Sequence, residues 1–179
     1  MIRTVSYCLC RLPRRYALEA GALLGQALYQ CIPKRRRIAE RNIKCTVGTN
    51  WSKSRVKHVA RAAFANLGRT LVEFMAFPEF DHTVIDKYVT VKGREHFDRA
   101  LEAGNGAILL TAHLGNWELL GASLGTLGYP LDGINKRQKG GFAEIINEYR
   151  EMTGTRMIYK GISLREAVRC LKDNHILGI

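Results

Sequence analysis

Signals for strands and helices alternate from residue 88 to the end of the chain. The short apolar run at 107–112 (AILLTA) is typical of a buried strand, and 131–135 (LDGIN) gives a weaker strand signal. The segments between such runs favour helices, several of which are followed by a glycine that can end them. Strands that alternate with helices are joined by right-handed crossovers into a parallel sheet. The sequence therefore predicts an α/β fold with a mainly parallel central sheet flanked by helices.

The individual elements can be assigned from the same pattern. Predicted strands cover 88–92, 107–112, 131–135, 155–159 and 175–179. Predicted helices between them cover 95–103, 116–127, 142–153 and 164–171. Two further helices precede them, at 34–47 and at 53–77, where Pro78 ends the second.

The first part of the chain is strongly basic and holds one apolar stretch. Residues 1–60 contain 13 of the 28 Lys and Arg and two of the 16 acids, which gives +11 of the total charge of +12. The stretch 16–32 lies between basic clusters, and as a helix it reaches about 25 Å, slightly less than a hydrocarbon core. We interpret it as an interfacial or marginally spanning membrane anchor. An ordinary buried first helix is the open alternative. The predicted domains are a membrane-anchor region at 1–50 and an α/β domain at 51–179.

The charge alone indicates a polyanionic partner, either nucleic acid or an anionic membrane face. Aromatic residues are not interleaved with the basic ones, and no nucleic-acid-binding motif occurs, so the membrane is the better supported partner. The five cysteines are odd in number and lack metal-ligand spacing. Reduced thiols in a cytoplasmic protein, with no metal site, are therefore expected.

One segment combines residues suited to acid–base chemistry. His113 lies where the strand 107–112 ends, the edge at which open α/β sheets bind ligands. Glu118 follows five residues later, and the two side chains can meet only if the chain turns between them. Gly115 permits such a turn, and Asn116 is a good helix N-cap. The spacing itself is common, but its position at a strand end favours a general-base pair.

A competing motif follows within the next helix. Gly121-Ala-Ser123-Leu-Gly125 matches the G-x-S-x-G pattern of serine hydrolases, which needs the serine at a sharp strand-to-helix turn. Ser123 is expected about two turns inside a helix, and His175 is the only later histidine. This alternative is disfavoured.

The string LLTAHLGNWELLG resembles the first catalytic block of the bacterial lipid A biosynthesis acyltransferases, a branch of the lysophospholipid acyltransferase-like superfamily. Other segments resemble that family in the same order: RIAERN at 37–42, FANLGRTLVE at 64–73, the glycines of 104–106 and YREMTG at 149–154. The resemblance covers nearly the whole chain. It implies acyl transfer from an acyl-carrier-protein or acyl-CoA thioester to a glycolipid hydroxyl, without a cofactor or an acyl-enzyme, at the cytoplasmic side of the inner membrane.

The same resemblance implies roles for individual residues. His113 corresponds to the base that deprotonates the acceptor hydroxyl, and Glu118 to its acidic partner. Arg150 corresponds to an arginine near the active site that stabilises an oxyanion or holds a phosphate. Lys136 and Arg137 stand where the family has Val-x-Arg-Pro, although the proline is missing here. These two residues, with Arg150 and Asn116, are the predicted substrate-binding residues.

The chain ends inside the apolar run 175–179, whereas the resemblance implies a further segment with an Asp-Gln-type motif. We therefore expect a C-terminally truncated product. A non-catalytic, membrane-associated remnant of the fold is the remaining alternative.

Overall fold

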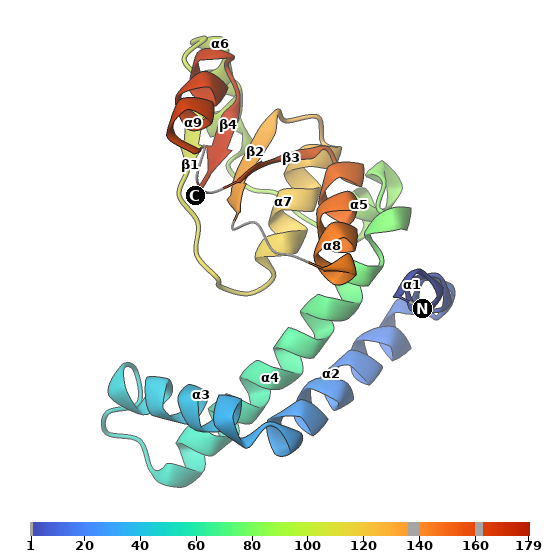
Figure 1. Ribbon diagram of the computed structural model, residues 1–179, viewed down its shortest axis with the longest axis vertical. Helices are drawn as coiled ribbons and strands as arrows, with labels where there is room; N and C mark the ends of the chain where they lie inside the picture. Colours follow the sequence, from blue (N-terminus) through green and yellow to red (C-terminus); the bar gives the residue numbers. More distant parts are fainter. Residues whose placement is uncertain (1, 136–139, 160–162) are drawn as a thin grey trace. The chain divides into compact units, whose positions relative to one another are not determined.

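The computed structural model describes residues 2–135, 140–159 and 163–179. The chain divides into two compact units, Arg3–Met75 and Ala76–Ile179. The first unit is helical in its described residues, and the second contains the sheet (Figure 1). The division after residue 75 differs from the domain boundary at residue 50 that the sequence favoured, because the helix 53–75 packs with the helices before it. The functional domains themselves stay a prediction.

The first unit consists of α1 (Ile2–Arg11), α2 (Arg14–Cys31), α3 (Pro33–Cys45) and α4 (Lys53–Met75). Helices α2 and α4 lie side by side (Figure 1), and glycines permit their close approach. A Cβ atom on Gly25 would lie 2.0 Å from the Phe64 carbonyl oxygen, and one on Gly68 would lie 1.9 Å from the Gly21 oxygen. Arg14 also forms an ion pair with Glu73 between the two helices.

Helix α2 uses only one of its faces in this packing. Its buried residues are Ala17, Gly21, Ala22, Gly25 and Tyr29. Its exposed large apolar side chains are Tyr16, Leu23 and Leu24. In the described parts of the chain, every helix is too short or too polar to cross a membrane. The predicted membrane association stays a prediction.

The second unit begins with short helices and continues as an α/β layer structure. Its elements are η1 (Phe77–Glu79), α5 (His82–Tyr88), α6 (Arg94–Glu102), β1 (Ala107–Leu109), α7 (Trp117–Thr126), β2 (Leu131–Asn135), α8 (Gly141–Met152), β3 (Thr155–Tyr159), α9 (Ser163–Lys172) and β4 (Ile176–Gly178). The strand order is β1-β4-β2-β3, and every pair is parallel. This arrangement confirms the predicted mainly parallel sheet flanked by helices.

Two apolar clusters lie on opposite faces of the sheet, because alternate residues of a strand point to opposite sides. On one face, Leu131 and Ile176 pack with Leu124 of α7 and with residues of α6. On the other face, Ile158 and Leu177 pack with Ala167 and Cys170, both from α9. Helices therefore cover both faces of the sheet, and a site can form at the carboxyl ends of the strands.

One predicted strand is wrong. Residues 88–92 (YVTVK) pair with no strand in the described part of the chain: Tyr88 ends α5, and the residues after it form no ladder. Val91 nevertheless packs against the core cluster around Leu131. An alternating apolar pattern thus predicts that an extended segment is half-buried. It does not by itself predict that the segment pairs with a strand through backbone hydrogen bonds. Helix α5, capped by Asp81 through its bond to the Val84 N–H, was not predicted.

Candidate active site

The chain turns sharply just beyond the carboxyl end of β1. The Thr111 N–H donates to the Ile179 carbonyl at 2.9 Å, which extends the sheet pairing past the end of β1. Three residues later the Leu114 N–H donates to the Ala112 carbonyl at 2.7 Å, so the backbone reverses at His113. Gly115 follows with a φ of 61°, in the left-handed region that glycine adopts without strain. The turn predicted between His113 and Glu118 is therefore confirmed.

Helix α7 starts directly after this turn. The Asn116 side-chain oxygen accepts a hydrogen bond from the Leu119 N–H at 3.0 Å, as expected for an N-cap. Glu118 accordingly lies in the first turn of α7. The turn and the cap together bring Glu118 back toward the strand end that carries His113.

A cavity of about 240 Å³ lies at this edge of the sheet. His113, Glu118 and Arg150 all line it, so the structure brings together three of the predicted site residues. The remaining lining is Phe77, Leu109, Thr111, Trp117, Leu120, Gly121, Ala122, Leu131, Gly133, Ile134, Asn135, Thr153, Thr155, Met157, Gly178 and Ile179. The cavity combines a polar rim with a mainly apolar interior, which is typical of sites for small amphipathic ligands.

Glu118 is held by Arg150 of α8. The guanidinium donates from Nε to Oε2 at 2.9 Å and from Nη2 to Oε1 at 2.5 Å. Both side chains are mostly buried, with 16% of Glu118 and 19% of Arg150 exposed. Such a two-point, charge-assisted pair fixes the position of the carboxylate. Both oxygens of Glu118 accept hydrogen bonds from Arg150. The observed partner of this carboxylate is therefore the Arg150 guanidinium, whereas the sequence predicted the His113 imidazole.

His113 contacts the site through Trp117. The two ring centroids are 4.5 Å apart with an interplanar angle of 45°, and the Trp117 Nε1 donates to Glu118 Oε1 at 3.2 Å. Within the described residues, no hydrogen bond joins the His113 ring to Glu118. The imidazole is exposed to solvent at the cavity, where a substrate can reach it. The aromatic ring of Trp117 was missed by the sequence analysis, although it stands between the two motif residues.

Asn116 is the one other predicted binding residue that the structure describes. Asn116 caps α7 and is not part of the cavity lining, so its role in binding stays a prediction. Lys136 and Arg137 lie outside the described residues.

The serine hydrolase alternative is wrong. Ser123 lies inside α7 with 1% of its surface exposed, and its hydroxyl donates to the Leu119 carbonyl at 2.7 Å. A nucleophile must be accessible at a strand-to-helix turn, and Ser123 is neither accessible nor at a turn.

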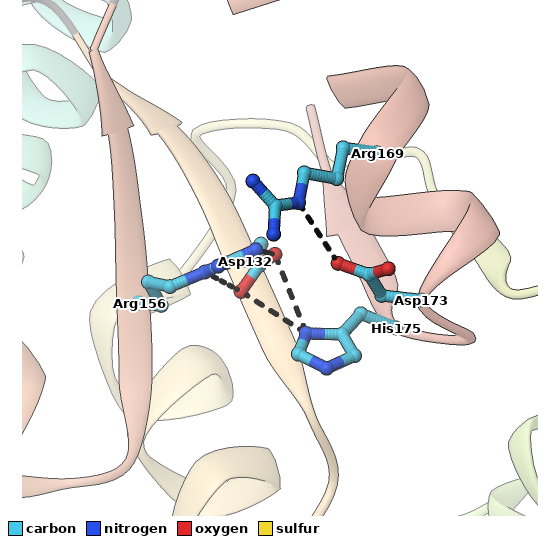
Figure 2. A network of polar contacts seen from close by, with 5 residues as sticks. All are labelled: Asp132, Arg156, Arg169, Asp173 and His175. Carbon is cyan, nitrogen blue, oxygen red and sulfur yellow. Dashed lines mark hydrogen bonds and ion pairs between the residues drawn. The ribbon is translucent and has the colours of Figure 1, made fainter. Parts of the chain in front are cut away.

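A second polar cluster, centred on Asp132 of β2, lies on the face of the sheet that α9 covers. Figure 2 shows its carboxylate between Arg156 of β3 and His175, with a bond of 2.8 Å from Arg156 Nε and a contact of 3.4 Å to His175 Nδ1. Burial opposes ionisation of this carboxyl, but hydrogen bonds from Arg156, Cys170 and His175 lower its pKa below the ordinary value.

Cys170 shares this environment. Burial, followed by its hydrogen bond to Asp132, raises the pKa of the Cys170 thiol to about 12, so the thiol stays protonated and unreactive. The cluster thus joins β2, β3 and the start of β4 and is structural. An acid beside Leu131 inside a predicted strand, 131–135, was the available sequence signal for it.

No group of three or more His, Cys, Asp or Glu side chains suited to a metal ion occurs in the part of the chain that the structure describes. All five cysteines lie within the described residues, and none of them is part of a disulfide.

Comparisons with known proteins agree with the motif-based resemblance. The model of the bacterial lipid A biosynthesis acyltransferase family matches residues 3–179. A phosphatidylinositol mannoside acyltransferase of Mycolicibacterium smegmatis is 33% identical over 95 residues, which cover 52% of this chain. The matched segment spans 31% of that relative's length.

Proposed function

Because this chain belongs to the bacterial lipid A biosynthesis acyltransferase family, we propose that it moves a fatty acyl group from a carrier-protein thioester to a hydroxyl of a glycolipid. The membership confirms the resemblance drawn from the motifs. The observation that carries the proposal is the cavity at the carboxyl edge of the sheet, lined by His113 and by the Glu118–Arg150 pair. The similar protein from Mycolicibacterium smegmatis, by its name, acylates a mannosylated phosphatidylinositol, which supports a glycolipid acceptor.

In the proposed reaction, His113 accepts the proton of the acceptor hydroxyl while the hydroxyl oxygen attacks the thioester carbonyl. The resulting tetrahedral centre collapses, the carbon–sulfur bond breaks, and the thiol leaves with the proton that His113 returns. The products are an ester and a free carrier thiol, and no residue of the chain becomes acylated. The exposed position of the imidazole at the cavity supports this role, since a general base must reach its substrate.

We propose that Glu118 and Arg150 act as one unit beside the base. The ion pair keeps a guanidinium at the polar rim, where two of its five N–H groups are used on Glu118. Its remaining donors are suited to a developing oxyanion or to a phosphate of the acceptor. Glu118 keeps Arg150 in position and also fixes Trp117, which contacts the His113 ring.

The proposed site of action is the cytoplasmic face of the inner membrane. Helix α2 exposes Tyr16, Leu23 and Leu24, and α3 carries the basic run 34–37. Apolar side chains next to basic ones favour adsorption to anionic lipid surfaces. Acyl carrier protein is anionic, so the same charge also favours its approach.

The direct test incubates the intact protein with dodecanoyl and hexadecanoyl carrier-protein thioesters and with two glycolipid acceptors, a lipid A precursor and a phosphatidylinositol mannoside. Mass spectrometry should detect an acceptor heavier by one acyl group, together with one equivalent of free carrier thiol. Thiol release without an acylated lipid would indicate thioester hydrolysis and contradict the proposal. Absence of both products would favour a non-catalytic, membrane-associated protein.

A further inference from the structure

Three glycines line the interior of the cavity. Gly133 of β2 and Gly178 of β4 are register partners in neighbouring strands, and Gly121 belongs to α7 on the same face. Glycine inside a strand weakens it and often marks a place where a ligand approaches closely. The cavity therefore contains positions at which side chains are missing from both the sheet and the helix.

Packing within the protein does not require these glycines. A Cβ on Gly133 would meet Met157 Cε at 3.4 Å, one on Gly178 the Asp132 carbonyl oxygen at 3.6 Å, and one on Gly121 a Leu131 methyl at 3.9 Å. All three are ordinary van der Waals distances, and none of these residues has a positive φ. Gly125 is different, because its Cβ would lie 2.1 Å from the Thr153 carbonyl oxygen. Packing within the protein thus does not explain why a side chain is missing at Gly133.

The lining becomes mainly apolar along the strands, away from the edge that carries His113. Asn135 lies at the carboxyl end of β2, on the edge that carries His113, whereas Leu131 lies at the opposite end of the same strand. Gly133 is midway, two residues or about 7 Å below Asn135. Met157 is the β3 partner of Gly133, and together with Leu131 it makes the deeper wall mainly apolar, although Thr155, the β3 partner of Leu131, also lines it. An amphipathic ligand with its reactive end at His113 would extend its hydrocarbon part past Gly133.

We propose that Gly133, with Gly178 and Gly121 beside it, determines how far an acyl chain enters the cavity and thereby sets the acyl length that is transferred. This inference rests on the acyl transfer proposed above. A side chain at position 133 fills the floor between the reactive end and the deeper wall, so it shortens the accepted chain while the reactive end keeps its place.

The test compares Gly133→Val with wild type on octanoyl, dodecanoyl and hexadecanoyl carrier-protein thioesters. Valine suits a strand, so the fold should tolerate it. We expect kcat/KM for hexadecanoyl relative to octanoyl to fall by about tenfold or more, as is usual when a hydrophobic pocket loses room for part of a ligand. Gly133→Ala should have a smaller effect in the same direction. Gly141→Ala is the matched control, because its Cβ meets nothing within 4 Å and the residue lies outside the lining.

Direct binding separates this inference from the proposed reaction. In a Trp51→Phe background, Trp117 at the cavity is the remaining tryptophan, and fatty acids brominated next to the carboxyl group should quench its fluorescence. Gly133→Val should weaken quenching by bromohexadecanoic acid more than by bromooctanoic acid, and Gly141→Ala should change neither. Equal effects on both lengths, or no effect, would overturn the inference even if wild type transfers acyl groups. Length-dependent binding without transfer would support it and count against the proposed reaction.

Discussion

Arg150 donates two hydrogen bonds to the carboxylate of Glu118, a residue 32 positions earlier in the chain. The pair joins α7 to α8 across the cavity, and both side chains are mostly buried. A carboxylate and a guanidinium held in this way should depend on each other, both for stability and for activity.

The first prediction concerns this mutual dependence. Arg150→Lys loses the two-point geometry, and Glu118→Gln loses the charge, so each should destabilise the fold by about 1–3 kcal/mol. Because both changes remove the same interaction, a double-mutant cycle from denaturant unfolding should give a coupling energy of about 1–2 kcal/mol. Additive effects would show that the pair contributes nothing as a pair.

The second prediction concerns the contact that aligns α7 with the end of α8. Gly125→Ala places a methyl group against the Thr153 carbonyl, so it should destabilise the fold by about 1–3 kcal/mol. Gly121→Ala in the same helix meets only ordinary contacts and should be neutral or stabilise by about 0.5–1 kcal/mol. Denaturant unfolding of both variants provides the comparison. Equal stabilities would mean that α7 can move away from the Thr153 turn without cost.

The third prediction concerns acid stability. Burial acts to raise the pKa of Asp132, but the hydrogen bonds from Arg156, Cys170 and His175 hold it below its ordinary value. A carboxyl with a lowered pKa in the folded state stabilises the protein above the unfolded pKa, and this contribution disappears as pH falls through the folded value. The free energy of unfolding should therefore fall between about pH 5 and pH 2, and Asp132→Asn should flatten that dependence.

Arg156→Met tests the role of Asp132 by removing the side chain that binds its carboxylate. It leaves the Asp132 carboxylate, which is 1% exposed, without its main cation, and should destabilise by about 3 kcal/mol at neutral pH. The loss should shrink at low pH, where Asp132 becomes protonated. An unchanged pH profile in both variants would contradict the assigned role of Asp132.

The fourth prediction concerns the exposed face of α2. Leu23 and Leu24 are 65% and 54% exposed, so replacing both with serine should leave the fold intact. Loss of two leucines from an apolar contact should weaken binding to anionic vesicles by about tenfold or more, as measured by co-sedimentation. Leu164→Ser is the control, since Leu164 is 79% exposed on α9 of the other unit. An equal effect of both changes would argue against α2 as the lipid-binding surface.

The sequence was sufficient for features that depend on nearby residues. Gly115 and Asn116 predicted the turn and the cap of α7, because backbone freedom and capping act within a few positions. Local strand signals predicted four of the five expected strands correctly, and their alternation with helices predicted a parallel sheet.

Features that depend on distant residues could not be derived in the same way. The binding of Glu118 by Arg150 follows from how α8 packs beside α7, and no local spacing encodes that packing. The failure of 88–92 to form a strand has the same origin, since a strand requires a partner as well as an alternating pattern. The buried pair of Asp132 and Arg156 likewise joins residues from two strands that meet only in the sheet.

The most direct test of the central claim is the turnover of His113→Ala in the intact protein, with stability measured in parallel. Because the imidazole is exposed, its removal should change the free energy of unfolding by less than about 0.5 kcal/mol. Loss of a general base should lower kcat/KM for acyl transfer by about 10²–10⁴-fold. Wild-type turnover in a folded His113→Ala protein would contradict the account.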